Sequence, residues 1–216
     1  MPRGAFITVE GGEGVGKTSS LEAIETYIRS RGHEVVTTRE PGGTALGEKV
    51  RHWILDGDHG ELSAEVEALL MFAARAEHLE KVIRPALERG VWVVCDRFSD
   101  ATEAYQGGGR GADRNFLLQL RAAVQAGLSP DLTILLDAPI EIGLSRIADR
   151  PHDHFEREGA AFFERVRSAY RAMAAEDPDR IRTIDASASQ ADVKIAVERE
   201  LDEFFERFEP AAEATG

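Results

Sequence analysis

The chain has 216 residues, of which 43% are hydrophobic and 30% are charged, and its formal net charge is −13. This length predicts one domain with a full core, the apolar share excludes intrinsic disorder, and no apolar run reaches the roughly 18–20 residues of a membrane helix. The acidity argues against general nucleic-acid binding, which needs clustered Lys and Arg, and the single cysteine, Cys95, fits a reducing cytoplasm.

The predicted secondary structure alternates between strands and helices along the whole chain. Most predicted strands are continuously apolar, which is typical of strands covered on both faces, and the first predicted helix stops at Gly32, a residue type favoured at C′. In chain order the elements are strand 5–10, helix 17–31, strand 34–38, helix 63–79, strand 91–95, helix 115–126, strand 132–136, helices 140–148 and 159–175, strand 181–185 and helix 191–208. The alternation predicts an α/β fold with a five-stranded parallel sheet and helices on both faces. Ligands of such sheets bind beyond the carboxyl ends of the strands.

The first predicted strand runs directly into a phosphate-binding motif. Residues 11–18 match G-x-x-x-x-G-K-[ST] between a predicted strand and a predicted helix, which is the context that identifies a P-loop. In this motif the glycines let backbone N–H groups surround phosphate oxygens, Lys17 reaches the β- and γ-phosphates, and the Thr18 hydroxyl coordinates Mg²⁺. The predicted nucleotide-binding residues are Gly11, Gly12, Glu13, Gly14, Val15, Gly16, Lys17 and Thr18.

The rest of the sequence narrows the class of P-loop protein. A GTPase would carry an N-K-x-D motif, yet the single asparagine, Asn115, is followed by Phe116. A small kinase fits better, and it needs a second anionic site for the acceptor and a mobile basic cover that excludes water. The strand at 91–95 ends in Asp96 and Arg97, where the carboxylate can hold Mg²⁺ and the guanidinium can grip an acceptor phosphate. A local ion pair capping the next helix is the alternative interpretation of these two residues.

Five further segments, taken with the P-loop and residues 96–98, resemble thymidylate kinases of the bacterial type. They are 38–44, 70–75, 104–111, 130–137 and 183–186, and the resemblance runs in order from about residue 5 to residue 205. It implies a nucleoside-monophosphate-kinase-like P-loop fold that transfers the γ-phosphoryl group of ATP to dTMP with Mg²⁺. The partners implied are dTMP, ATP and a second copy in a homodimer, with no nucleic-acid polymer and no membrane. Residues 1–209 are expected to form one kinase domain with a lid at about 146–158, followed by a frayed tail at 210–216.

The resemblance also implies which residues bind dTMP. Phe72 stacks on the thymine ring, Arg75 reaches the 4-carbonyl from the same helical face, and Thr102 reads the N3 side of the base. For Phe72 the alternative interpretation is a core position, because an aromatic residue on a helix is more often buried. The whole substrate-binding set is Glu13, Glu40, Pro41, Arg51, Phe72, Arg75, Arg97, Thr102, Tyr105 and Gln106. Residues 107–111 are expected to form a flexible loop, from which Arg110 could also touch the acceptor.

The sugar and the acceptor phosphate have their own implied contacts. Glu13 lies near the 3′-hydroxyl, and Tyr105 and Gln106 line the sugar, where a bulky ring at C2′ excludes ribonucleotides. Arg97 holds the dTMP phosphate. Arg51, on the helix that follows the second strand, is a further candidate for the same phosphate, and its alternative interpretation is a solvated helix face.

The lid departs from the family's pattern. In that family a glycine at the P-loop position of Gly14 accompanies catalytic arginines in the lid, so the resemblance implies that Arg150 or Arg157 makes the transition-state contact. His154 stands where one lid arginine is expected, and a histidine is largely neutral near pH 7 unless a phosphate raises its pKa. Arg146 is implied to lie against adenine, together with the loop after the last strand. A charged connection between helices is the alternative for this segment.

Two other functions remain open from the residues alone. A kinase for a different small acceptor would share the P-loop and the basic lid but would not need Phe72 and Arg75 together. A non-catalytic nucleotide-dependent switch would bind ATP without acceptor-dependent turnover. Cys95 is expected to be a buried strand residue and not a nucleophile.

Overall fold

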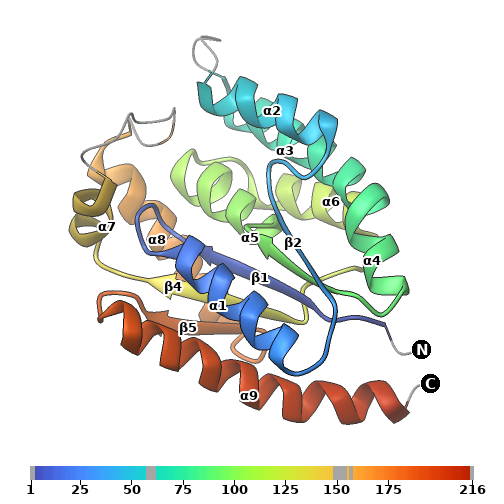
Figure 1. Ribbon diagram of the computed structural model, residues 1–216. Coiled ribbons are helices and arrows are strands. Elements are labelled where there is room, and N and C mark those ends of the chain that lie inside the picture. The colour runs from blue at the N-terminus through green and yellow to red at the C-terminus, as the bar shows by residue number, and fades with distance from the viewer. Residues whose placement is uncertain (1–2, 57–61, 148–154, 156–157, 215–216) are drawn as a thin grey trace.

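A five-stranded parallel sheet forms the centre of the molecule. The computed structural model describes residues 3–56, 62–147, 155 and 158–214 (Figure 1). The strands are β1 (Phe6–Gly11), β2 (Val35–Arg39), β3 (Trp92–Asp96), β4 (Leu132–Asp137) and β5 (Ile181–Asp185), in the order β2-β3-β1-β4-β5. Every predicted strand is present within one residue at each end, and all neighbouring strands pair in parallel. The predicted fold class is confirmed.

Helices cover both faces of this sheet (Figure 1). The front face in that view carries α1 (Lys17–Ser30) and α9 (Gln190–Ala214). The other helices are α2 (Ala45–Asp56), α3 (Ala64–His78), the π-helix η1 (Leu79–Ile83), α4 (Arg84–Glu88), α5 (Ser99–Thr102), the π-helix η2 (Glu103–Gly109), α6 (Arg114–Gln125), α7 (Ile140–Ile147) and α8 (Ala160–Glu176). Along β1, Ile7 packs in the core cluster of α1 and α9, whereas its neighbour Phe6 packs in the cluster of η1 and α4. Both side chains are fully buried, which explains why this strand is continuously apolar.

Helix α1 follows the local pattern of its sequence. Leu21, Ile24 and Ile28 are buried against the sheet. Gly32 has a φ of 88° and allows the N–H of His33 to donate to the carbonyl oxygen of Ile28 at 3.3 Å. The predicted end of this helix is therefore confirmed.

The glycine-rich segment differs from its prediction. Residues 107–111 were expected to form a flexible loop, but the π-helix η2 includes the first three of them. A Cβ atom on Gly108 would lie 2.6 Å from the Cβ atom of Ala169, and one on Gly109 would lie 2.5 Å from the ring of Phe162. These glycines therefore let η2 pack closely on α8, and tertiary contact overrides the low helix propensity of glycine.

Helix α9 extends further than its apolar pattern. It includes residues 210–214, which the sequence indicated as part of a frayed tail and in which Ala and Glu favour a helix. Residues 215–216 lie outside the described residues. None of the helices in the described parts of the chain is both long enough and apolar enough to cross a membrane.

Candidate active site

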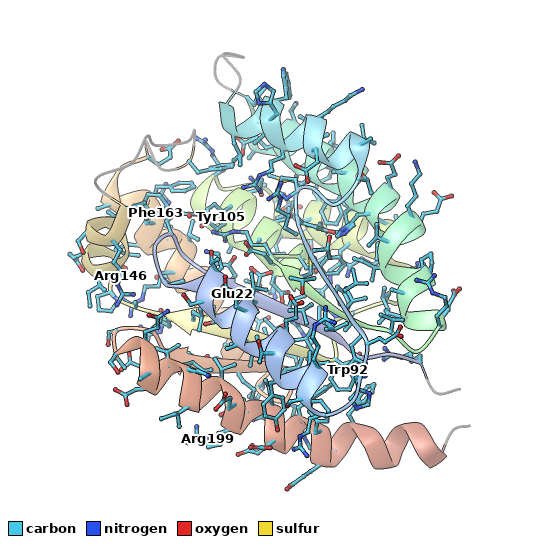
Figure 2. All side chains as sticks on the ribbon, viewed as in Figure 1. Glu22, Trp92, Tyr105, Arg146, Phe163 and Arg199 are labelled. Carbon is cyan, nitrogen blue, oxygen red and sulfur yellow. The ribbon has the colours of Figure 1, made fainter. Side chains whose placement is uncertain are left out.

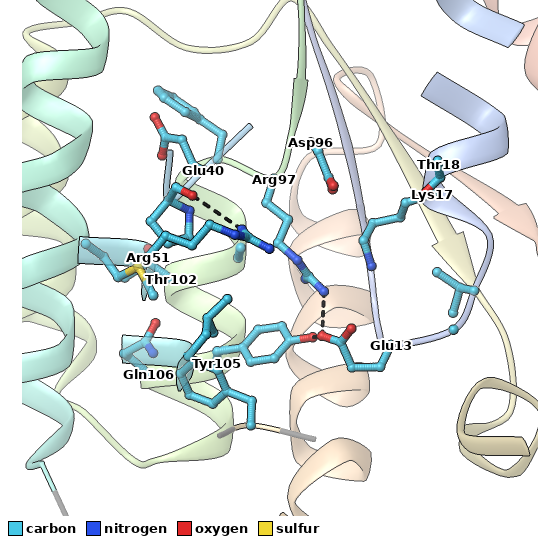
Figure 3. A pocket seen from close by; sticks show the side chains of 18 of the residues that line it. Glu13, Lys17, Thr18, Glu40, Arg51, Asp96, Arg97, Thr102, Tyr105 and Gln106 are labelled. Atoms are coloured by element: carbon cyan, nitrogen blue, oxygen red, sulfur yellow. Dashed lines mark hydrogen bonds and ion pairs between the residues drawn. The ribbon is translucent and has the colours of Figure 1, made fainter. Parts of the chain in front are cut away.

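A cavity of about 500 Å³ opens at the carboxyl edge of the sheet (Figure 3). Most of the predicted site residues line it, namely Glu13, Gly14, Val15, Gly16, Lys17, Thr18, Glu40, Pro41, Arg51, Arg75, Asp96, Arg97, Thr102, Tyr105, Gln106 and Arg146. Gly11 and Gly12 are not among the lining residues. Arg150, His154 and Arg157 lie outside the described residues. The fold thus gathers residues from six separate segments of the sequence around one space.

The loop between β1 and α1 has the geometry of a phosphate-binding loop. Gly14 has a φ of 67°, and a Cβ atom there would lie 2.0 Å from the carbonyl oxygen of Gly143. Among the described side chains none caps the start of α1, so the N–H groups of its first turn are available to an anion. The Lys17 ammonium donates to the carbonyl oxygen of Gly12 at 2.6 Å. Burial, and then repulsion from Arg97, lower the pKa of Lys17, and a bound anion would offset both effects.

Arg97 is held firmly against the P-loop (Figure 3). Its φ of 65° lies in the left-handed region, which costs an L-residue about 1–2 kcal/mol. Its Nη2 donates to Glu13 Oε1 at 2.7 Å, and its Nη1 donates to the carbonyl oxygen of Gly11 at 2.9 Å. The Tyr105 hydroxyl donates to the same Glu13 oxygen at 2.7 Å, and the ring centre lies 4.8 Å from the guanidinium carbon of Arg97. These contacts bring the guanidinium close to Lys17 in one part of the cavity.

Asp96 and Thr18 supply oxygen atoms to the same cavity. The Oδ1 atom of Asp96 is buried and accepts no hydrogen bond from the described residues. A buried carboxylate oxygen without a partner is costly, and a hard cation would satisfy it. The described residues contain no group of three or more His, Cys, Asp or Glu that could hold a metal by themselves. The pair therefore fits Mg²⁺, which commonly takes one or two protein ligands and completes its shell with water and phosphate oxygens.

Arg75 lines the cavity next to Glu40 and Thr102, which lie away from Lys17 in Figure 3, and only 2% of it is exposed. Its Nε donates to Glu40 Oε2 at 2.7 Å, and its Nη2 donates to the carbonyl oxygen of Phe98 at 3.1 Å and to Thr102 Oγ1 at 3.0 Å. The Nη1 atom is buried and finds no acceptor within the described residues. One donor of Arg75 thus remains for a carbonyl oxygen of a ligand.

Phe72 does not lie where its predicted role requires. It is 2% exposed, it is not among the residues that line the cavity, and the guanidinium carbon of Arg75 lies 4.5 Å from its ring centre. Met71 lines the cavity instead, because it precedes Arg75 by four residues and shares its side of α3. This spacing was a usable signal in the sequence. The other lining residues that the sequence analysis missed are Leu55, Phe98, Ala101, Ile147 and Phe155.

A second cavity, of about 570 Å³, lies between the P-loop, α1 and the start of α9. Arg146 lines both cavities, and its Nη1 donates to the carbonyl oxygens of Ala186 at 3.2 Å and Gly14 at 3.4 Å. The end of α7 is therefore tied to the P-loop and to the loop after β5. The end of α7 and the loop after β5 are the segments that the resemblance implied for adenine.

A buried carboxyl group lies under the P-loop at the end of β1. Glu10 is fully buried and accepts hydrogen bonds from the N–H of Phe98 and the hydroxyl of Tyr170, both at 2.7 Å. Burial, followed by the nearby Asp100, raises the pKa of Glu10 to about 8. The Tyr170 hydroxyl also accepts a hydrogen bond from Arg97 at 3.3 Å. Glu10 therefore supports Arg97 through one intervening side chain.

Folding stability is expected to depend on the titration of Glu10. Because its pKa is raised on folding, the folded chain binds more protons than the unfolded chain between pH 4.5 and about 8. The contribution of Glu10 to the free energy of unfolding is complete below this window and falls as the pH rises through it, by at most about 1.4 kcal/mol per pH unit. The substitution Glu10→Gln removes the titration, so the variant should gain stability relative to the parent as the pH rises, which urea unfolding across the window measures. Glu22 is an exposed glutamate of α1 and gives the control Glu22→Gln (Figure 2). In this control the free energy of unfolding should change with pH as it does in the parent. The same pH dependence in Glu10→Gln as in the parent contradicts the prediction.

Comparisons with known proteins point to one family. The family model described as Thymidylate kinase matches residues 9–197. A thymidylate kinase of Nitrosomonas europaea is 53% identical over 206 residues, which are 95% of each chain. One of Methylococcus capsulatus is 53% identical over 203 residues, which are 94% of this chain and 97% of the relative. The crystal structure of thymidylate kinase from Ehrlichia chaffeensis superposes with a TM-score of 0.75 at 34% identity, over 93% of this chain and 99% of that chain.

Proposed function

The chain belongs to the thymidylate kinase family and phosphorylates dTMP to dTDP, and we propose that it does so in the cavity of about 500 Å³, with ATP as the donor. The observation that carries this proposal is the spacing of three cations. Lys17 and Arg97 approach each other at the P-loop, and Arg75 is buried against Glu40 and Thr102, which lie on the side of the cavity away from Lys17 (Figure 3). A donor triphosphate, an acceptor monophosphate and a base with a carbonyl group would each meet one of them.

The P-loop residues and Lys17 bind the β- and γ-phosphates of ATP. Arg97 grips the dTMP phosphate and aligns one of its oxygens with the γ-phosphorus, because phosphoryl transfer depends on in-line placement and on charge neutralisation. Arg51, whose Nη1 donates to the carbonyl oxygen of Pro41 at 3.3 Å, adds a second cation beside the acceptor phosphate. The acceptor phosphate is already ionised, so the reaction needs no general base.

Thr18 and Asp96 would hold Mg²⁺. The ion supplies charge neutralisation on the phosphate oxygens during transfer. The unpartnered Oδ1 atom of Asp96 supports this assignment. We further propose that Arg146 lies against adenine and that Arg150 or Arg157 closes over the phosphates from a lid at about 146–158.

The opposite end of the cavity takes the nucleoside. Arg75 Nη1 donates to the 4-carbonyl of thymine and Thr102 lies on the N3 side. Tyr105, Gln106 and Glu13 surround the sugar, and Glu40 and Pro41 complete the wall. Met71 takes the place against the base that the sequence analysis gave to Phe72.

Acceptor selectivity tests this proposal. Coupled measurement of ADP release is expected to give the highest kcat/KM with dTMP, followed by dUMP, because both bases offer a 4-carbonyl to Arg75. The acceptors dCMP, dGMP and AMP should be turned over at least about 10²-fold less efficiently. In dCMP and AMP an amino group replaces the carbonyl that Arg75 Nη1 needs, which leaves a buried donor unpaired, and dGMP and AMP carry a two-ring purine in place of the smaller pyrimidine. A preference for any of these three contradicts the proposed placement. ATP binding without acceptor-dependent turnover would favour a nucleotide-dependent switch.

We also propose that the protein is a cytoplasmic homodimer in which residues 1–209 of each copy form one kinase domain. Val66 and Leu69 on α3 and Leu118 on α6 are exposed apolar side chains, and α3 packs against α6. A second copy would cover these side chains. Sedimentation velocity is expected to give a particle of twice the 23.7 kDa chain mass, and Leu69→Glu should shift it to the monomer.

A further inference from the structure

A chain of hydrogen-bonded polar side chains leads away from Arg75 to Thr38 on the strand β2. Glu40 accepts from Arg75 Nε through Oε2 at 2.7 Å and pairs with His78 Nδ1 through Oε1 at 2.9 Å. The other ring nitrogen of His78, Nε2, lies 2.8 Å from Thr38 Oγ1. Glu40 is 5% exposed and His78 is fully buried. None of these contacts beyond Arg75 is needed to explain the chemistry at the phosphates.

Glu40 and Thr38 determine which ring nitrogen of His78 donates a hydrogen bond and which one accepts. An ionised carboxylate only accepts, so the Nδ1 atom of His78 must carry a hydrogen and donate it to Glu40. In the neutral ring Nε2 then accepts from the Thr38 hydroxyl. His78 is thereby fixed at both nitrogens, and both oxygens of Glu40 are engaged.

The loop after β2 closes the outer end of this chain. Gly43 has a φ of 74°, and a Cβ atom there would lie 2.6 Å from both His78 Nε2 and Thr38 Oγ1. A glycine is required because the backbone passes directly over this hydrogen bond. Because Glu40 and His78 are buried, the hydrogen bond between them is stronger than it would be in water, and a missing partner for either side chain costs more.

Glu40, at the end of this series of hydrogen bonds nearest to Arg75, helps to determine the orientation of the Arg75 guanidinium plane. Glu40 holds Nε, while the Phe98 carbonyl and Thr102 hold Nη2. The planar group is thereby tied on two sides, and Nη1 remains as the buried donor without an acceptor in the described residues. A shift of Glu40 would rotate this plane and change the position of Nη1.

We propose that His78 is a positioning residue for recognition of the acceptor base, because it fixes Glu40, which in turn orients Arg75 toward the 4-carbonyl of thymine. The inference rests on the proposed placement of dTMP in the cavity. His78 touches no substrate; it acts through two side chains.

Two substitutions test the hydrogen bonds of the two ring nitrogens of His78 separately. The amide nitrogen of Asn reaches the place of Nδ1, and that of Gln reaches the place of Nε2. His78→Asn keeps the donor to Glu40, so its KM for dTMP should stay within about 3-fold of the parent. His78→Gln keeps a partner for Thr38 and loses the donor to Glu40, so its KM for dTMP should rise by about 10-fold. The KM for ATP should be unchanged in both variants, and the preference for dTMP over dCMP should fall in His78→Gln alone.

Thermal unfolding distinguishes positioning from a merely structural role. The smaller Asn leaves a void, so His78→Asn should be the less stable variant although it binds dTMP normally. Equal KM values for dTMP in the two variants, or a KM that follows stability, would overturn the inference. If His78→Gln does not fold, His78→Leu takes its place: it also lacks the donor to Glu40, so its KM for dTMP should rise by about 10-fold, and a parental KM would also overturn the inference. Arg75→Lys tests the placement itself, since an unchanged KM for dTMP there removes the base from this end of the cavity whatever the His78 variants do.

Discussion

Replacing Lys17 with methionine is expected to lower kcat by about 10³-fold. The Lys17 ammonium lies in the cavity beside Arg97 and donates to the carbonyl oxygen of Gly12 at 2.6 Å. Methionine has a similar length and no charge, so the charge that develops on the β- and γ-phosphate oxygens loses its main side-chain partner. The backbone N–H groups of the P-loop remain, and ATP binding should weaken only several-fold. Coupled kinetics with saturating dTMP, together with equilibrium binding of ATP, measure the two effects separately.

The fold should tolerate this substitution. Burial and the adjacent Arg97 lower the pKa of Lys17, which means that the charged form is disfavoured where it stands. Removing that charge should leave the melting temperature equal to or above the parental value. Lys81→Met is the matched control, since Lys81 is exposed on η1 and does not line the cavity. Turnover in Lys17→Met at the level of this control would remove Lys17 from the reaction.

The substitution Arg97→Ala is expected to reduce kcat/KM for dTMP by about 10²–10³-fold, with a higher KM for dTMP and a lower kcat. Arg97 is the residue whose contacts with Gly11 and Glu13 keep a guanidinium in the cavity beside Lys17. Without Arg97 the acceptor phosphate loses a bidentate hydrogen-bonding partner and its alignment with the donor. The KM for ATP should change little, because the P-loop binds the donor independently. Initial-rate kinetics with each substrate varied in turn would show this division.

Two further variants sharpen this test. Arg97→Lys restores a charge without the planar fork, so its kcat/KM should lie between those of the parent and Arg97→Ala. Arg199→Ala removes an exposed arginine of α9 and should leave both substrates unaffected (Figure 2). Parental values of KM for dTMP and of kcat in Arg97→Ala would exclude Arg97 from the acceptor site.

Much of the fold and part of the site could be read from local patterns. The five strands were predicted within one residue because continuous apolar runs between turn residues specify buried parallel strands. The P-loop was predicted because its chemistry depends on the backbone of consecutive residues, so that spacing in the sequence is spacing in the site. The positions of Asp96 and Arg97 followed from the rule that ligands bind at the carboxyl ends of parallel strands, and both line the cavity.

Tertiary structure decided what depends on the direction of a side chain or on a distant partner. The spacing of four residues puts Met71 and Arg75 on one side of their helix, but only the packing of α3 shows that this side faces the cavity while Phe72 is buried away from it. The π-helix η2 forms where the sequence indicates a loop, because its glycines fit against α8, more than fifty residues further along the chain. The raised pKa of Glu10 and the contacts of His78 with Glu40 and Thr38 likewise arise between segments that are remote in sequence. Periodicity records which face of an element is apolar, whereas burial, charge pairing and helix rotation are properties of the packed molecule.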